Sequence, residues 1–367
     1  MAKWQRPLEK LGLKLRNPDA NFWRDRSVFL TGHTGFKGGW IALWLSHMGA
    51  KVHGYALTPP TKPSFFEETQ LQSSLSNSRI NDIRDFKNLC QAMQAASPSV
   101  VIHMAAQPLV RESYNSPVNT FSTNLIGTVN LLEAARNTDS VQAIVNITTD
   151  KCYENQEWLW PYRENDRLGG HDPYSSSKAC AELASAAYRK SFLAEAGVYL
   201  ATVRAGNVIG GGDWAADRLV PDFLRALDAG EILHIRSPNA IRPWQHVLEP
   251  LSGYLLLAEE LVSQGADYAD AWNFGPEEGD AKPVYTIVEQ LCDKFPGSRW
   301  QLDGEPQLHE AGLLKLDSSK AKAKLNWLPR WPLETALNKS VEWHQAWKRG
   351  ESMAAFSLRQ ISDYEAA

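Results

Sequence analysis

The stretch that decides the fold is Val28-Phe29-Leu30-Thr31-Gly32-His33-Thr34-Gly35-Phe36-Lys37-Gly38. Its first four residues form an apolar run that predicts a buried strand. Gly32, Gly35 and Gly38 follow with the spacing G-x-x-G-x-x-G, which lets the backbone approach a diphosphate group closely. The N-terminus of a following helix would supply amide donors and partial positive charge. This stretch therefore predicts the strand, turn and helix of a dinucleotide-binding site.

The residues downstream continue the pattern. Ile41, Trp44, Leu45 and Met48 recur at helical spacing, so they predict a helix with one apolar face. Strands alternating with helices predict the α/β class, with a Rossmann-type, doubly wound parallel sheet. The predicted strands after the first are residues 51–57, 100–103, 143–147 and 199–204, and the helices between them are residues 86–96, 119–136 and 174–196.

The composition changes after residue 204, where glycines and prolines become frequent. Loops and short elements are expected there, forming a smaller, loop-rich α/β substrate domain. Residues 272–276 predict a last strand that returns to the main sheet. The predicted organisation is a dinucleotide-binding domain over residues 22–206 and 243–275, a substrate domain over residues 207–242 and 276–350, and a polar N-terminal extension over residues 1–21.

Composition excludes several classes of protein. The formal net charge of −4 argues against a nucleic-acid surface. No apolar run is long enough to span a membrane, and residues 1–16 lack the apolar segment of a signal peptide. We therefore expect a cytoplasmic protein that contacts neither nucleic acid nor membrane. No metal site or disulfide framework is expected, because no C-x-x-C occurs among Cys90, Cys152, Cys180 and Cys292.

Two segments predict catalytic residues. Tyr174 and Lys178 are four residues apart on a predicted helix, so their side chains share one face. A lysine ammonium there would lower the pKa of the phenol and so prepare it to remove a proton from an alcohol. Thr149, Asp150 and Lys151 follow the predicted strand 143–147, at the edge where open α/β sheets place their chemistry.

The choice of cofactor is left open by the residues themselves. NAD-binding sites usually carry an acidic residue after the second strand, and none occurs at residues 55–58. His33 and Lys37 would tolerate a 2′-phosphate, so NADP is possible beside NAD. Asp82 could contact adenine or lie on the surface, and Asn124 could be a structural residue or a loop anchor. The residues assigned to the cofactor are Gly32, His33, Thr34, Gly35, Phe36, Lys37, Gly38, Asp82, Ile83, Ala105, Ala106, Gln107, Asn124, Tyr174 and Lys178.

Several arginines suggest a second site for phosphate. A guanidinium group forms paired hydrogen bonds with a diphosphate. Most of these arginines lie in the glycine-rich and proline-rich half of the chain, where the substrate domain is expected. The residues assigned to the substrate are Arg111, Arg204, Asn207, Arg218, Arg236 and Arg242.

The motifs together resemble the extended short-chain dehydrogenase/reductase family over residues 26–345. The resemblance rests on the glycine fingerprint, on H-x-A-A at residues 103–106, on Y-x-x-x-K and on N-V-I-G-G-G-D at residues 207–213. Thr149-Asp150 resembles the nucleotide-sugar 4,6-dehydratases, most of whose dTDP-glucose members carry glutamate where this chain has Lys151. Lys151 and five segments of the chain are similar to the members of this group that act on CDP-glucose. The segments are TGHTGFKG, HMAAQPLVR, TTDKCYENQEW, RAGNVIGGGDW and IRPWQHVLEPLSGY.

The resemblance implies a lyase that converts CDP-glucose to CDP-4-keto-6-deoxyglucose and water, with a tightly held NAD that is not consumed. The product would serve 3,6-dideoxyhexose and lipopolysaccharide O-antigen biosynthesis. The resemblance also implies a homodimer or homotetramer that pairs through the helices at residues 119–136 and 174–196. On the second of these helices, Ala179, Ala184 and Ala187 would allow close approach, although they could equally face the sheet.

The implied mechanism gives each catalytic residue a role. Tyr174 takes the proton of the sugar 4-hydroxyl and Thr149 binds the same oxygen. Asp150 must be protonated to help the 6-hydroxyl leave, which requires burial. Lys151 either removes the C5 proton, for which it must be neutral, or stays charged and stabilises the enolate.

The alternatives are a dTDP- or GDP-sugar dehydratase, a UDP-sugar 4-epimerase or decarboxylase, and a catalytically silent dinucleotide sensor. Asp150 and Lys151 argue against the epimerase and decarboxylase, which need no such acid–base pair. Tyr174 and Lys178 argue against the sensor.

Overall fold

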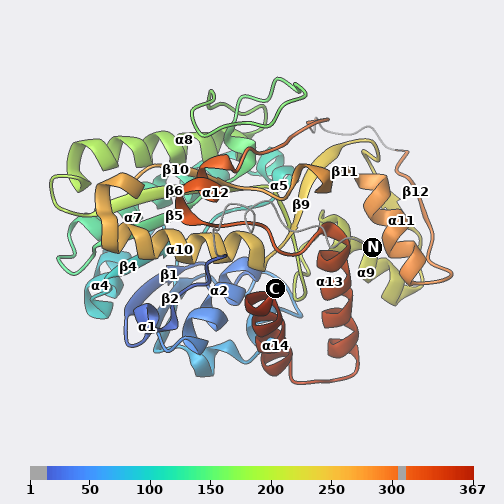
Figure 1. Cartoon of the computed structure of the whole chain (residues 1–367), viewed down its shortest axis with the longest axis horizontal. Coiled ribbons are helices and arrows are strands. Elements are labelled where there is room, and N and C mark those ends of the chain that lie inside the picture. The colour runs from blue at the N-terminus through green and yellow to red at the C-terminus, as the bar shows by residue number, and fades with distance from the viewer. Residues whose placement is uncertain (1–14, 305–310) are drawn as a thin grey trace.

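The computed structural model describes residues 15–304 and 311–367 (Figure 1). Its centre is a seven-stranded sheet with the strand order β10-β6-β5-β4-β1-β2-β3 and parallel pairing throughout. The strands are β1 (Ser27–Thr31), β2 (Lys51–Ala56), β3 (Asn77–Ile80), β4 (Val100–His103), β5 (Ala143–Ile147), β6 (Tyr199–Ala205) and β10 (Ala271–Phe274). The predicted α/β class and parallel sheet are confirmed, and the predicted last strand does return to the sheet beside β6.

The sheet is covered on both faces because its residues alternate between two hydrophobic clusters. Phe29, Val101 and Ile144 pack in one cluster with α4 (Phe86–Ala96) and α7 (Gly127–Arg136). The intervening strand residues pack in the other cluster with α2 (Phe36–His47) and α10 (Leu248–Gln264). The strand order reverses between β1 and β4, which is where doubly wound sheets bind their ligands.

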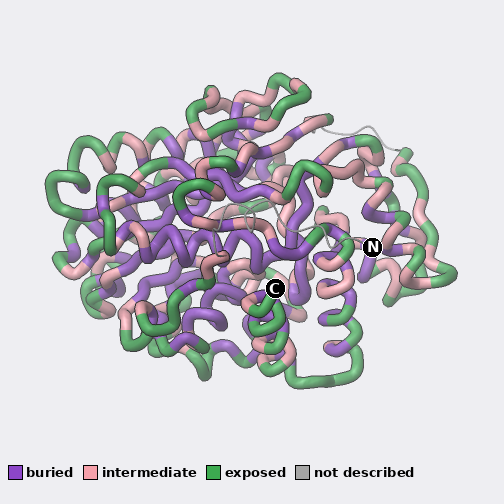
Figure 2. The backbone as a smooth tube through the Cα atoms, viewed as in Figure 1, coloured by how far each residue is buried: buried purple, intermediate pink, exposed green. Residues whose placement is uncertain are grey.

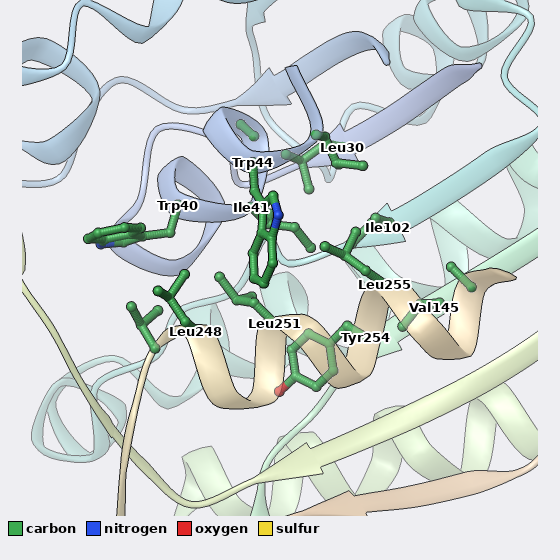
Figure 3. Packing of buried hydrophobic residues seen from close by; sticks show 14 of the residues in the cluster. Leu30, Trp40, Ile41, Trp44, Ile102, Val145, Leu248, Leu251, Tyr254 and Leu255 are labelled. Carbon is green, nitrogen blue, oxygen red and sulfur yellow. The ribbon is translucent and has the colours of Figure 1, made fainter. Parts of the chain in front are cut away.

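The helix α10 was not predicted from the sequence, yet it is the most buried helix of the fold. Figure 3 shows Leu251 and Leu255 of α10 facing Ile41 and Trp44 of α2. Figure 2 shows the strands and α10 as the buried centre of the molecule. Because α10 is buried on nearly every side, it lacks the one-sided apolar stripe by which surface helices are recognised.

The two longest predicted helices each contain a π-helical turn. The segment 119–136 is formed by α6 (Pro117–Phe121), a π turn (Ser122–Ile126) and α7, and the segment 174–196 by α8 (Pro173–Tyr188) and a π turn (Arg189–Leu193). The remaining short helices before residue 120 are α1 (Ala20–Trp23), α3 (Phe65–Glu68) and α5 (Val110–Asn115).

A smaller unit lies at the end of the molecule away from α4 and α7 (Figure 1). It contains one sheet of β7 (Asn207–Ile209), β9 (Ile241–His246) and β11 (Ala281–Pro283), and a second of β8 (Leu233–Ile235) and β12 (Trp300–Leu302). The helices α9 (Leu219–Ala229) and α11 (Val284–Lys294) pack against these strands around a core of their own.

The C-terminal helices connect the two units. They are α12 (Ser319–Leu325), α13 (Leu333–Lys348) and α14 (Met353–Ala366), and α13 and α14 lie side by side (Figure 1). Leu337 of α13 belongs to the core of the smaller unit, whereas Trp343 belongs to the main core. The predicted boundary at residue 350 therefore stays a prediction, since α13 contributes to both cores.

The described part of the predicted N-terminal extension is held against α10. Arg16 pairs with Glu259, and Arg330 donates a hydrogen bond to the carbonyl of Arg16 at 2.9 Å. Residues 1–14 of that prediction lie outside the described residues. Within the described ranges, no helix is long and apolar enough to cross a membrane, and no cluster of metal-binding side chains occurs.

Candidate active site

A cavity of about 1850 Å³ opens at the C-terminal edge of the main sheet, between the two units. Its walls include the glycine turn after β1, the loop after β4, the end of β5, the start of α8 and the loop that leads into α9. Because parallel strands present their C-terminal ends at one edge, residues distant in sequence meet here.

The glycine turn is too tight for other residues. Gly32 has φ +77°, and a Cβ on Gly38 would lie 2.0 Å from the Gly32 carbonyl oxygen. No side chain among the described residues caps the first amides of α2 at Gly35. These open donors lie at the positive end of the helix dipole, so the turn forms a cradle that fits the diphosphate of a dinucleotide.

The side chains of His33 and Lys37 are both engaged by other residues of the protein. Burial lowers the pKa of His33 to about 4, and its Nε2 lies 2.8 Å from Ser78 Oγ, outside the lining of the cavity. Lys37 extends to α10 and donates to the Tyr254 hydroxyl at 3.4 Å. Burial, followed by the charges of Arg218 and Lys178, lowers the pKa of Lys37 to about 7. The structure does not place the His33 side chain in the cavity, so the assignment of this side chain to the cofactor is not supported and the argument for NADP loses the contribution of His33.

The loop after β4 is held in place by Asn124. Ala105, Ala106 and Gln107 line the cavity as predicted. Asn124 accepts a hydrogen bond from the Gln107 amide at 2.8 Å and donates to Ser177 Oγ at 2.9 Å, so it ties this loop to α8. It does not line the cavity, and its assignment as a cofactor contact is corrected to that of a loop anchor.

Asp82 and Ile83 also line the cavity, beyond the end of β3. The Asp82 carboxylate is paired with Arg84, and its carbonyl accepts a hydrogen bond from Tyr55 at 3.1 Å. Ile83 is buried, and its side chain lies where a Cβ on Gly127 would clash. Contacts with the rest of the protein therefore hold both residues in place at this edge of the cavity.

The predicted catalytic residues meet at one point of the cavity. Thr149 ends the loop after β5 and donates to Asp150 Oδ1 at 3.0 Å. Tyr174 and Lys178 lie on the first two turns of α8, and Tyr174 forms a hydrogen bond with Thr149. Lys151 follows Asp150 in a 3₁₀ turn and lines the same cavity. The structure thus brings together all five residues that were predicted to be catalytic.

The electrostatics of Tyr174 differ from the prediction. Burial raises the pKa of the phenol to about 12, with the Thr149 hydrogen bond acting in the opposite direction. Lys178 donates to the Ile147 carbonyl at 3.1 Å, and burial lowers its pKa to about 8 against the opposing charge of Glu182. The expectation that Lys178 lowers the pKa of the phenol does not hold in the protein alone, where Tyr174 is a neutral phenol.

Asp150 has the environment that a general acid needs. The side chain is buried, and burial raises the pKa of its carboxyl group against the opposing effects of Lys151, Thr149 and Arg242. Its Oδ2 has no hydrogen-bond partner among the described residues and lies near Gly206, where a Cβ would be 3.1 Å away. A neutral carboxyl group with a free oxygen can give a proton to a leaving hydroxyl.

Five of the six residues assigned to the substrate line the cavity, and one does not. They are Asn207 on β7, Arg242 on β9, Arg218, which pairs with Asp213 at 2.8 Å, and Arg111 and Arg236. Arg204 is 2% exposed and does not line the cavity. Its assignment to the substrate is wrong.

Arg204 instead forms a buried ion pair behind the catalytic residues. Its Nε lies 2.8 Å from Glu182 Oε1, and Glu182 also accepts from Thr148 Oγ1. The pair therefore links β6 and the end of β5 to α8. Glu182 was missed in the sequence, although its position four residues after Lys178 could have indicated it.

The fold and the site define a class of protein. A glycine cradle at the switch point of a doubly wound sheet, with a tyrosine and a lysine one helical turn apart beside it, is the site of a short-chain dehydrogenase/reductase. A model of the family described as GDP-mannose 4,6 dehydratase matches residues 29–340, and the chain belongs to that family.

Proteins of known name are similar in sequence to this chain over most of its length. A protein of Salmonella typhimurium strain LT2 named CDP-glucose 4,6-dehydratase is 55% identical over 95% of this chain and 99% of its own length. A dTDP-glucose 4,6-dehydratase of Xanthomonas campestris is 23% identical over 76% of this chain and 83% of its own.

Solved structures share the fold. That of dTDP-glucose 4,6-dehydratase from Bacillus anthracis in complex with NAD has a TM-score of 0.73 at 20% identity, covering 90% of this chain and 99% of its own. MoeE5 in complex with UDP-glucose and NAD also has a TM-score of 0.73, at 22% identity, covering 87% and 98%.

Proposed function

We propose that this protein converts CDP-glucose to CDP-4-keto-6-deoxyglucose and water, with NAD as a bound cofactor that is regenerated in each turnover. The observation that carries the proposal is the buried Asp150 carboxyl group beside Thr149 and Tyr174. A simple alcohol dehydrogenase or epimerase needs no such acid. The choice of a cytidine nucleotide rests on the 55% identity to the CDP-glucose 4,6-dehydratase of Salmonella typhimurium.

The cofactor would lie along the cavity from Asp82 to Lys178. The glycine turn and the open amides of α2 would hold its diphosphate, and Ala105 and Ala106 would let it lie close to the end of β4. When bound, NAD supplies a hydride acceptor and a positively charged ring near Tyr174. Solved structures that share this fold and are in complex with NAD support this choice over NADP.

The roles of the side chains follow from their surroundings. Tyr174 must give up its own proton to act as a base, and its pKa of about 12 shows that the protein alone does not prepare it. A cation brought by the cofactor would lower the pKa of the phenol. Thr149 then shares the sugar 4-oxygen with Tyr174. Once the 4-ketone has formed, Asp150 donates a proton to the departing 6-hydroxyl group.

Lys151 would act at C5 between the two hydride transfers. The ketone at C4 acidifies the C5 proton, and Lys151 lines the cavity directly after Asp150. We propose that Lys151 removes this proton. The alternative is that its charge stabilises the enolate while another group is the base.

The test is an assay of the purified protein with NAD against CDP-glucose, dTDP-glucose, GDP-mannose and UDP-glucose. CDP-glucose should yield a 4-keto-6-deoxy sugar without accumulation of NADH, and the other three should react at least about tenfold more slowly. Preference for another nucleotide would make the protein a different dehydratase. A 4-epimer would indicate an epimerase, and no reaction would favour a silent dinucleotide sensor.

We also propose a homodimer or homotetramer, acting in the cytoplasm. Apolar side chains on α6, α8 and the π turn between α6 and α7 are exposed, namely Val118 (82%), Ile126 (49%) and Leu183 (59%). Ala184 and Ala187 accompany them on α8, whereas Ala179 is buried beside Cys152 and faces inward. Light scattering of wild type and Leu183→Arg should show an oligomer that the substitution weakens, and a wild-type monomer would contradict the proposal.

A further inference from the structure

Three charged side chains that line the cavity form a cluster. They are Arg111 on α5, Arg236 directly after β8, and Asp217 in the loop between β7 and α9. Oδ1 of Asp217 accepts hydrogen bonds from Arg111 Nη1 at 3.2 Å and from Arg236 Nη1 at 2.7 Å. One carboxylate oxygen thus bridges two guanidinium groups from separate parts of the chain.

The bridge is accessible, and its loop is strained. The Asp217 side chain is 34% exposed, and its φ of +61° lies in the left-handed region that residues other than glycine rarely adopt. Burial acts to raise the pKa of Asp217, but the hydrogen bonds from Arg236 and Arg111 hold it below its ordinary value. The carboxylate therefore stays charged and bound to the arginines at neutral pH.

A neighbouring acid–arginine pair in the same loop is built differently. Asp213 is 5% exposed, pairs with Arg218 and also accepts a hydrogen bond from the Ala215 amide at 3.1 Å. The Asp213 carboxylate is thus fixed by its own backbone as well as by its arginine. Asp217 lacks this burial, so its carboxylate is the one that can be displaced.

We propose that Asp217 occupies, in the ligand-free protein, the place of a phosphate group of the nucleotide sugar, and that the diphosphate displaces it from Arg111 and Arg236. The proposal rests on the proposed function in that the site takes a nucleoside diphosphate. Carboxylate and phosphate oxygens bind the same guanidinium donors, so both cannot hold them at once. Asp217 keeps the two arginines together and lowers the affinity for any ligand that needs them.

The test compares wild type with Asp217→Asn by isothermal calorimetry, with cytidine, CDP, UDP and inorganic pyrophosphate as probes. The amide removes the negative charge that competes for the arginines. CDP and pyrophosphate should bind about three- to tenfold more tightly to the variant, which is the scale of partly exposed ion pairs. Cytidine, which has no phosphate, should bind equally to both. Asp217→Gly, which also relieves the left-handed backbone, should show the same gain.

Two further variants separate competition from general charge. Glu154 lines the same cavity but pairs with Arg167 at 2.7 Å, so Glu154→Gln removes a negative charge without touching the bridge. It should change CDP affinity by less than about twofold. In an Arg236→Met background, the gain from Asp217→Asn should shrink, because one of the contested donors is gone.

The outcomes distinguish this proposal from the proposed function. Weaker CDP binding in Asp217→Asn would mean that Asp217 orients the arginines, and an equal gain for cytidine would mean that it acts through the loop; either result overturns the proposal. A further outcome is that the protein binds CDP no more tightly than UDP, while pyrophosphate shows the predicted gain in Asp217→Asn. In that case the proposed cytidine nucleotide is wrong, and the role of Asp217 stands.

Discussion

At the scale of single residues, burial decides the chemistry of this site more than direct pairing does. Tyr174 and Asp150 both have a raised pKa because they lie in the protein interior, so Tyr174 is a neutral phenol and the Asp150 carboxyl group holds a proton more readily than an exposed one. This suits the role proposed for Asp150, which is to give a proton. It does not suit the role proposed for Tyr174, which is to accept a proton as a phenolate, so we expect the phenol to depend on the charge of a bound cofactor.

Replacement of Tyr174 by phenylalanine should abolish chemistry without abolishing binding. Tyr174→Phe removes only the hydroxyl that takes the sugar proton, so turnover should fall about 10²- to 10⁴-fold. Cofactor and CDP-glucose affinities, measured by calorimetry, should stay within a few-fold of wild type. Tyr188→Phe on the same helix, far from the cavity lining, is the matched control. Near-normal turnover of Tyr174→Phe would remove the tyrosine from the mechanism.

Replacement of Lys151 should stop the reaction after the first hydride transfer. In either of its roles Lys151 acts once the ketone has formed, so Lys151→Met should accumulate NADH and the 4-keto-glucose intermediate. Single-turnover absorbance of the reduced cofactor measures this directly. A variant that never reduces its cofactor would place Lys151 in substrate binding or in the first step.

How far single residues can be predicted from sequence depends on whether their partners are close in the chain. Thr149, Asp150, Tyr174 and Lys178 were found because each lies in a local pattern at a strand end or on a helix turn. Arg204 was misassigned because its partner Glu182 is 22 residues away on another element, so only the fold reveals the ion pair. Nothing in the sequence distinguishes such an arginine from one that faces a phosphate.

At the scale of elements, the turn after β1 and the helix α8 carry the site. The predicted boundaries of α4 and β4 match the structure, because hydrophobic periodicity and caps are local signals. The helix α10 escaped prediction because it is buried on nearly every side, and Pro250 and Gly253 within it resemble loop residues. The small strands β7, β8 and β9 are only three to six residues long and depend on tertiary pairing.

The glycine turn predicts a strict steric limit. Gly38→Ala would place a methyl group 2.0 Å from the Gly32 carbonyl oxygen, so the cradle must open and cofactor binding should weaken at least about tenfold. Gly279→Ala is the control, because nothing lies within 4 Å of its added Cβ. Fluorescence titration with NAD measures both variants, and unchanged affinity in Gly38→Ala would show that the diphosphate lies elsewhere.

The buried pair behind α8 predicts a coupled change in stability and pH dependence. Glu182→Gln leaves Arg204 without its counter-charge, which should cost about 3–5 kcal/mol of unfolding free energy. Glu182 also raises the pKa of Lys178, which is about 8, so the loss of charged Lys178 should begin at lower pH in the variant. The alkaline limb of kcat/KM should therefore shift downward.

The control for this prediction is Glu133→Gln, which removes a surface pair with Arg136. It should leave both the unfolding midpoint in denaturant and the pH profile nearly unchanged. A Glu182→Gln variant that loses stability but keeps its alkaline limb would limit Glu182 to a structural role.

At the scale of the whole molecule, the chain joins two units around one cavity. The main sheet supplies the cofactor cradle and the catalytic residues, and the smaller unit supplies Asn207, Arg218, Arg236 and Arg242. The helix α13 packs into both cores, which fixes how the two halves of the site face each other. The class of fold was predictable from alternating strands and helices, whereas this joint core was not, because it unites residues more than a hundred positions apart.

The central claim is that one cofactor removes a hydride from C4 of the sugar and returns it to C6 of the same molecule. The most direct measurement uses CDP-glucose carrying deuterium at C4, with the position of the label in the product read by NMR. We predict deuterium at C6 of the 4-keto-6-deoxy sugar. Deuterium found in free NADH, retained at C4 or lost to solvent would contradict the claim.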